Sequence, residues 1–128
     1  MKYLTYSHRF AELILNSDYA IRQEIEKVIN NISVNQLKER YKEDSKRLKS
    51  EGKKERRGMQ ASLNTIFRED FLKLGWEKEK NVFNDNDNDL VIDFWKRDIG
   101  IDVAFNHRSF AGGDLLRLQA AGEVKNIM

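Results

Sequence analysis

The chain of 128 residues contains no cysteine and no proline. Without cysteine it can form neither disulfide bonds nor thiolate zinc sites, and it has no cysteine nucleophile. No apolar run approaches the roughly 20 residues that a membrane-spanning helix needs. The N-terminus turns polar at once at Ser7-His8-Arg9, which is unlike the apolar core of a signal peptide. These absences predict a cytoplasmic protein with no membrane partner.

The chain also has little excess of one charge over the other, because its net charge is only +2 although 34% of the residues are charged. A small net charge means that any anionic partner must meet a local patch rather than a polycation. One such patch is the segment 38–57, which holds ten Lys or Arg and five Asp or Glu residues. Two interpretations stay open for it: a solvated helix face with i,i+4 ion pairs, or an arm that contacts phosphates or a partner.

Hydrophobic residues make up 40% of the chain, which suffices for one core and one domain over residues 1–128. The spacing of isoleucine and valine over 21–32 predicts an amphipathic helix that Ser17 or Asp18 caps. A second helix is predicted over 63–74, with Gly75 placed to end it. The remaining predicted elements are three strands of an antiparallel meander and a last helix, at 76–83, 90–95, 99–105 and 115–121.

The predicted fold class is therefore α/β, with N-terminal helices followed by a sheet meander and a helix. Such a sheet would gain a further, parallel strand after the last helix, so either the domain is incomplete at its C-terminus, which we expect, or its sheet is unusually small. The second and third strands are joined by a tight turn at Lys96-Arg97-Asp98. That turn would bring Asp93 and Asp102 to nearly facing positions of one hairpin.

Both aspartates stand in apolar surroundings, Asp93 between Ile92 and Phe94 and Asp102 between Ile101 and Val103. Burying a carboxylate there is costly unless a positive charge compensates it. A divalent cation such as Mg²⁺, which prefers oxygen ligands, would relieve the repulsion between the two acids. The alternative is ion pairing with basic residues nearby, namely Lys96, Arg97 or Arg108.

The pattern around these acids resembles the catalytic hairpin of the BglII/BstYI-like type II restriction endonucleases, a branch of the PD-(D/E)xK nuclease superfamily. The residues that carry the resemblance are Asp93, the nine-residue step to Asp102, then Val103-Ala104-Phe105 and Ser109-Phe110. Other parts of the chain agree with the family, and the resemblance extends thinly over nearly all of it. These parts are Tyr6-Ser7-His8, the helix around Glu24–Ile32, Ala61-Ser62-Leu63-Asn64 and Leu74-Gly75-Trp76.

The resemblance implies a restriction-endonuclease-like core and magnesium-dependent hydrolysis of double-stranded DNA at a short palindrome. It implies that Asp93 and Asp102 bind Mg²⁺, that the Val103 carbonyl adds a ligand, and that Asn64 helps to position the attacking water. For Asn64, a helix N-cap or a surface amide is the alternative. A homodimer is expected because a two-fold symmetric enzyme matches a two-fold symmetric site.

Basic residues beside the acids would hold the DNA backbone, and these are Lys96, Arg97 and Arg108.

Ala104 departs from the family, which carries Gln at this position, whereas the wider superfamily carries Lys or Glu. A methyl group cannot hydrogen-bond to the attacking water. Either another group such as Asn106 or His107 takes over, or the chain is a catalytically weakened relative, or the alanine was introduced to trap a DNA complex. Two other functions therefore stay open: a non-catalytic DNA-binding or assembly protein on a nuclease scaffold, and a helical interaction module that uses segment 38–57.

Overall fold

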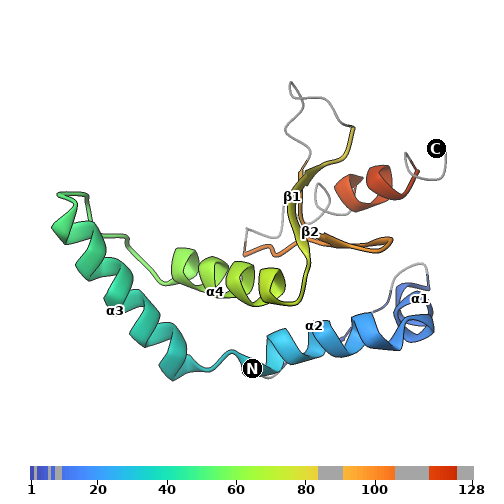
Figure 1. Ribbon diagram of the computed structural model, residues 1–128, viewed down its shortest axis with the longest axis horizontal. Coiled ribbons are helices and arrows are strands. Elements are labelled where there is room, and N and C mark those ends of the chain that lie inside the picture. The colour runs from blue at the N-terminus through green and yellow to red at the C-terminus, as the bar shows by residue number, and fades with distance from the viewer. Residues whose placement is uncertain (2, 6, 8–9, 84–90, 106–115, 124–128) are drawn as a thin grey trace. The chain divides into compact units, whose positions relative to one another are not determined.

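A computed structural model describes all residues of the chain except 2, 6, 8–9, 84–90, 106–115 and 124–128 (Figure 1). Contacts divide the chain into two compact units, Met1–Asp70 and Phe71–Met128. The helices and strands in chain order are α1 (Ala11–Ser17), α2 (Tyr19–Asn31), α3 (Val34–Ser50), α4 (Gln60–Lys73), β1 (Glu77–Asn81), β2 (Val91–Lys96) and β3 (Ile99–Ile101). Residues 116–123 are also helical.

The helices of the first unit begin where short polar side chains accept backbone hydrogen bonds. The Asp18 carboxylate accepts from the amide of Ile21 at 3.3 Å, so the predicted cap of α2 is confirmed. The Ser33 hydroxyl accepts from the amide of Gln36 at 3.1 Å and caps α3 in the same way. The sequence analysis did not predict α1, a helix of seven residues with no buried side chain. The buried apolar residues of this unit are Ile21, Val28, Ile32, Leu48, Ile66 and Phe67.

The second unit is built on a three-stranded antiparallel sheet in the order β1-β2-β3, which confirms the predicted meander. Phe71 is its most buried aromatic residue, and its ring lies 5.2 Å from that of Trp76 and 4.6 Å from that of Phe94. Gly75 ends the preceding helix with a φ of 81°, a left-handed conformation that glycine adopts without strain. The Lys96 ammonium donates to the carbonyl of Leu74 at 2.6 Å and so ties β2 to the end of that helix.

The third strand is shorter than predicted, because β3 ends at Ile101 and not at Phe105. The amide of Val103 donates to the side chain of Asp93, so this group is not available to continue the strand ladder. The turn is also tighter, with only Arg97 and Asp98 between the two strands. The predicted last helix is confirmed at 116–123, whereas the predicted turn at 84–89 lies outside the described residues. Among the described residues no helix is long and apolar enough to cross a membrane.

Candidate active site

The hairpin of β2 and β3 sets the positions of the two predicted acids. Its paired residues are Phe94 with Ile101 and Trp95 with Gly100, in an antiparallel register. The paired register ends at Ile101, and one further step would set Asp102 opposite Asp93. Directly opposed side chains of antiparallel strands lie on the same face of a sheet, within reach of each other. A local turn therefore sets the spacing of the two acids, without help from distant parts of the chain.

Asp93 is half-buried on β2, and one of its oxygens has a backbone partner. Oδ2 accepts a hydrogen bond of 2.8 Å from the amide of Val103. Within the described part of the chain, Oδ1 receives no hydrogen bond. The carboxylate is thus held in one orientation by the strand that follows the turn, and it keeps one oxygen for another ligand.

Asp102 has an arginine partner that sequence reasoning missed. Its side chain is only 6% exposed, and its two oxygens lie 3.1 and 3.3 Å from Nη1 of Arg117. The same nitrogen lies 3.3 Å from the carbonyl oxygen of Val91. One guanidinium therefore offsets the charge of a buried carboxylate and links the helix at 116–123 to the first residue of β2. The signal in the sequence was a lone arginine between Leu116 and Leu118 of the predicted helix.

The basic residues expected to hold DNA differ in how accessible they are. Arg97 is exposed at the hairpin turn, where its φ is 45°. Lys96 is half-buried and already donates to the carbonyl of Leu74. Arg108 lies outside the described residues, as do Asn106 and His107. Of the described pair, Arg97 is thus the group better placed to meet an external anion.

Comparison with known protein families shows which family contains this chain and its hairpin. A model of the restriction endonuclease BglII/BglIII family matches residues 3–128. The chain belongs to this restriction endonuclease family. The match confirms the resemblance found in the sequence and the restriction-endonuclease-like α/β fold class. A search of curated proteins and a search of solved structures each gave no match.

Membership of the BglII/BglIII family makes this chain a restriction endonuclease in the general sense, a nuclease whose partner is DNA. Restriction endonucleases generally use divalent metal ions, so the donor groups at the hairpin can be tested for fit. The available oxygens are Oδ1 of Asp93, the carboxylate of Asp102 and the carbonyl of Val103. No group of three or more acidic, histidine or cysteine side chains gathers within the described part of the chain. A hard cation that keeps most of its own waters needs only one or two carboxylates, so this small oxygen set fits such an ion.

Two other expected residues of the restriction endonuclease lie on exposed surface. Ala104 is exposed just beyond the acids, and its methyl group offers no donor or acceptor there. Asn64 is exposed on α4 in the first unit, four residues beyond the start of that helix, so it is not the N-cap. It lines an open depression of about 330 Å³ together with Arg57, Gly58, Gln60 and Ala61. The structure therefore joins Asp93, Asp102 and Val103 in one hairpin and describes Asn64 as a surface amide of the first unit.

Proposed function

We propose that this restriction endonuclease is a magnesium-dependent enzyme of type II that hydrolyses double-stranded DNA at a short palindrome. The observation that carries the proposal is the register of the β2–β3 hairpin, which would set Asp102 opposite Asp93 if it continued by one residue, in a chain that matches the family over residues 3–128. Two carboxylates at facing positions repel each other, and a bound divalent cation is the usual way in which nucleases balance that cost.

In this proposal Asp93 and Asp102 hold Mg²⁺, with the Val103 carbonyl as a further ligand. The ion would supply a Lewis acid that polarises the scissile phosphate and lowers the pKa of a bound water. The Val103 amide fixes Asp93 in its orientation through the 2.8 Å hydrogen bond, which pre-organises one ligand. Arg117 must then share Asp102 with the ion or move from it, since its Nη1 lies within 3.3 Å of both oxygens of that carboxylate.

The basic groups near the hairpin would bind the phosphates on either side of the cleaved bond. Arg97 suits this role because it is exposed at the turn, and Arg108 follows the same strand in the sequence. Lys96 would act mainly by anchoring β2, because its ammonium is engaged by Leu74. Asn64 would orient the attacking water. A homodimer would present one such site to each strand of a palindrome.

A second candidate is a non-catalytic DNA-binding or assembly protein on the same scaffold. Ala104 favours it, because the resemblance places a Gln at this position and the methyl group cannot orient a water. Loss of one positioned catalytic group costs about 100-fold or more in rate. The two candidates share DNA as their ligand and differ in whether bonds are broken.

Plasmid cleavage separates them. The chain, Ala104→Gln and the double variant Ala104→Gln/Asp93→Asn would be incubated with supercoiled DNA in Mg²⁺ and in Mn²⁺. Discrete fragments from the chain or from Ala104→Gln, with none from the double variant, support the endonuclease. Salt-sensitive DNA binding without cutting by any of the three in either metal favours the scaffold instead.

A further inference from the structure

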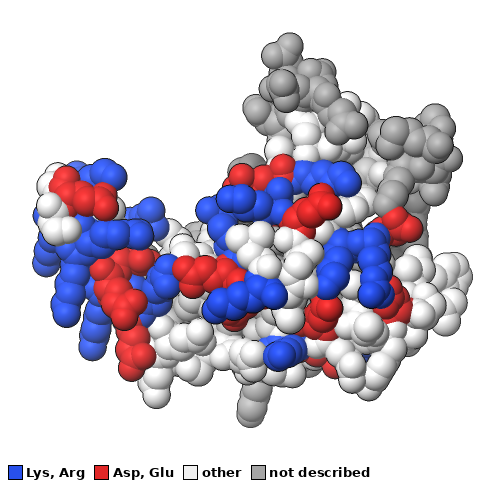
Figure 2. Space-filling model, in the orientation of Figure 1, with Lys and Arg blue, Asp and Glu red and all other residues white. Residues whose placement is uncertain are grey.

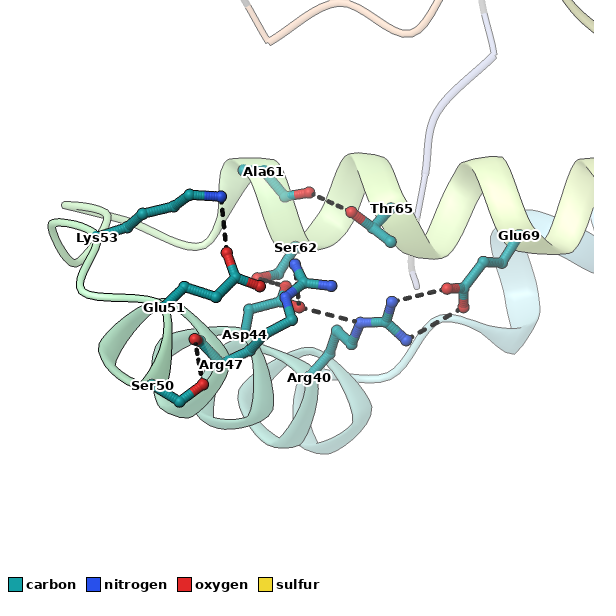
Figure 3. Close-up of polar contacts among 10 residues, drawn as sticks. All are labelled: Arg40, Asp44, Arg47, Ser50, Glu51, Lys53, Ala61, Ser62, Thr65 and Glu69. Carbon is teal, nitrogen blue, oxygen red and sulfur yellow. Dashed lines mark hydrogen bonds and ion pairs between the residues drawn. The ribbon is translucent and has the colours of Figure 1, made fainter.

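On one face of helix α3 the charged side chains form ion pairs with other residues of the first unit. Asp44, only 5% exposed, accepts a hydrogen bond of 2.7 Å from the hydroxyl of Ser62, which lies on α4 (Figure 3). The guanidinium groups of Arg40 and Arg47 each approach its Oδ1 at 3.5 Å. A buried carboxylate is thus surrounded by one hydroxyl and two cations from its own unit.

Arg40 on this face also reaches across to α4. Its two terminal nitrogens lie 2.7 and 3.2 Å from the two oxygens of Glu69, a bidentate pair drawn in Figure 3. The hydrogen bond to Glu69 is the main reason that the pKa of Arg40 is raised above its usual range, so the group stays charged. On this inner face two arginines balance two carboxylates, and no net charge is left for an external partner.

The opposite face of α3 carries lysines without such partners. Lys38, Lys42 and Lys46 follow one another at four-residue steps and are all exposed. Each step turns the helix by about 40° and advances it by about 6 Å, so the three ammonium groups form one stripe. Within the described part of the chain none of the three makes an ion pair or a side-chain hydrogen bond. We call these three residues the lysine face.

The loop after α3 adds further cations and is held against the helix. The Tyr41 hydroxyl donates to the carbonyl of Arg56 at 2.9 Å, which fixes the loop 15 residues downstream. The two acids of this loop are engaged, Glu51 with Lys53 at 2.7 Å and Glu55 with Lys49 at 3.9 Å, whereas Glu39 and Glu43 are exposed on α3 between the lysines. The exposed loop cations with no ion pair among the described residues are Lys54, Arg56 and Arg57. Figure 2 shows Lys and Arg side chains gathered over α3, with acidic side chains among them.

We propose that the lysine face and the loop cations Lys54, Arg56 and Arg57 bind the phosphodiester backbone of DNA, separately from the acids of the hairpin. The proposal rests on the proposed function, because it takes DNA as the ligand. The new element is a second DNA-contacting surface, which lies in the first unit. Of the two interpretations of segment 38–57, the structure favours the phosphate-contacting arm, because the i,i+4 pairing is confined to the inner face.

The composition of the surface favours nucleic acid over a protein partner. Between Lys38 and Arg57 the apolar side chains are Tyr41 and Leu48, which are half-buried and buried, so no exposed large apolar group can anchor a protein. Phosphate contacts need only positive charge, and they gain affinity by releasing condensed counterions. Lysines on flexible stems read no bases, so the surface would raise affinity for all sequences alike.

The test uses two triple variants with the same change in charge. Lys38→Gln/Lys42→Gln/Lys46→Gln removes the lysine face. Lys27→Gln/Lys73→Gln/Lys78→Gln removes three exposed lysines elsewhere and serves as the control. Binding of each to a fluorescent DNA duplex would be measured by anisotropy over a series of salt concentrations without divalent metal, and urea unfolding would verify that both variants are folded.

The lysine-face variant should lose about fivefold to tenfold in affinity per contacting lysine at 0.1 M salt, with a slope of log K against log salt shallower by about 2 to 3. The control should change affinity by less than about threefold. Equal losses in the two variants would overturn the inference and leave the endonuclease proposal standing. A parent chain that binds no duplex at any salt concentration would overturn both.

Discussion

Each unit of this restriction endonuclease buries a carboxylate, and the two differ in what surrounds it. The Asp44 side chain is 7% exposed and meets a hydroxyl and two guanidinium groups, all from its own unit. The Asp102 side chain is 6% exposed, pairs with Arg117 and follows β3, one step beyond the pairing of Ile101 with Phe94, the neighbour of Asp93. Burial is therefore nearly equal at the two places. What separates them is a like-charged neighbour, whose repulsion a structural ion pair avoids and a bound cation would relieve.

This difference has an energetic meaning. Removing Asp44 leaves buried donors without an acceptor, which costs stability. Removing the charge of Asp93 relieves repulsion and leaves its backbone hydrogen bond available to an amide oxygen, which costs little stability. The first carboxylate should thus be needed for folding, and the second for the reaction.

The largest expected effect is the loss of cleavage in Asp93→Asn. We expect the rate to fall about 1,000-fold in whichever background cuts plasmid DNA, the chain itself or Ala104→Gln, because one of the two proposed metal ligands loses its charge. The free energy of unfolding should change by less than about 1 kcal/mol, since the new side chain can still accept from the Val103 amide. Initial cleavage rates and urea unfolding give the two numbers. A stable variant that cuts at the parent rate would remove Asp93 from the site.

Asp44→Asn should have the converse effect. Arg40 and Arg47 lose their buried counter-charge, and we expect unfolding to become easier by about 3 kcal/mol. Glu43→Gln, at an exposed position of the same helix, is the matched control and should change stability by less than about 0.5 kcal/mol. Mg²⁺ affinity of the folded Asp44 variant should equal that of the parent. A loss of metal affinity with unchanged stability would reverse the two assignments.

Much of this fold follows from local sequence patterns, and so do the positions of the two acids at the hairpin. The helix α2, the meander and the opposed positions of Asp93 and Asp102 depend on periodicity and on one short turn, so they could be predicted. The strand beyond Ile101 could not, because a side chain takes the amide of Val103 that the ladder would use.

The partners of the buried acids were missed for a different reason. Ser62 meets Asp44 from 18 residues away, and Arg117 meets Asp102 from 15 residues away, and no local pattern encodes such contacts. The sequence positions of Asp44 and Arg117 still carry a signal. Asp44 falls three residues after Tyr41 and four before Leu48, on the apolar side of its helix, and Arg117 stands between leucines. A charged residue at an apolar position of a predicted helix is the signal that could have found both.

Arg117→Gln removes the guanidinium that pairs with Asp102 and so tests how the two buried carboxylates differ. Without metal we expect unfolding to become easier by about 2 kcal/mol, since a buried carboxylate then faces Asp93 with less compensation. Mg²⁺ should stabilise this variant more than it stabilises the parent, because the ion no longer competes with the guanidinium for Asp102. Thermal unfolding over a series of MgCl₂ concentrations, with NaCl at matched ionic strength as the control, measures both effects. Equal stabilisation of variant and parent by Mg²⁺ would mean that Arg117 does not compete with the ion.

The smallest expected effect concerns Glu51, an exposed carboxylate that contrasts with both buried acids. The Lys53 ammonium, 2.7 Å from its Oε2, lowers the pKa of Glu51 below its ordinary value, chiefly through their hydrogen bond. A pKa that is lowered by folding adds stability above the unfolded pKa, and this contribution disappears as the pH falls through the folded one.

Lys53→Met should therefore raise the pKa of Glu51 toward the ordinary value, and 1 M NaCl should do the same in the parent, because salt screens exposed pairs. A ¹³C NMR titration of the Glu51 carboxyl measures both changes, with exposed Glu39 as the internal control. The same salt should leave most of the stability lost in Asp44→Asn intact, since buried pairs are screened much less. If salt abolished both effects alike, the network around Asp44 would be as exposed to solvent as the surface pair, and the contrast between the carboxylates would fail.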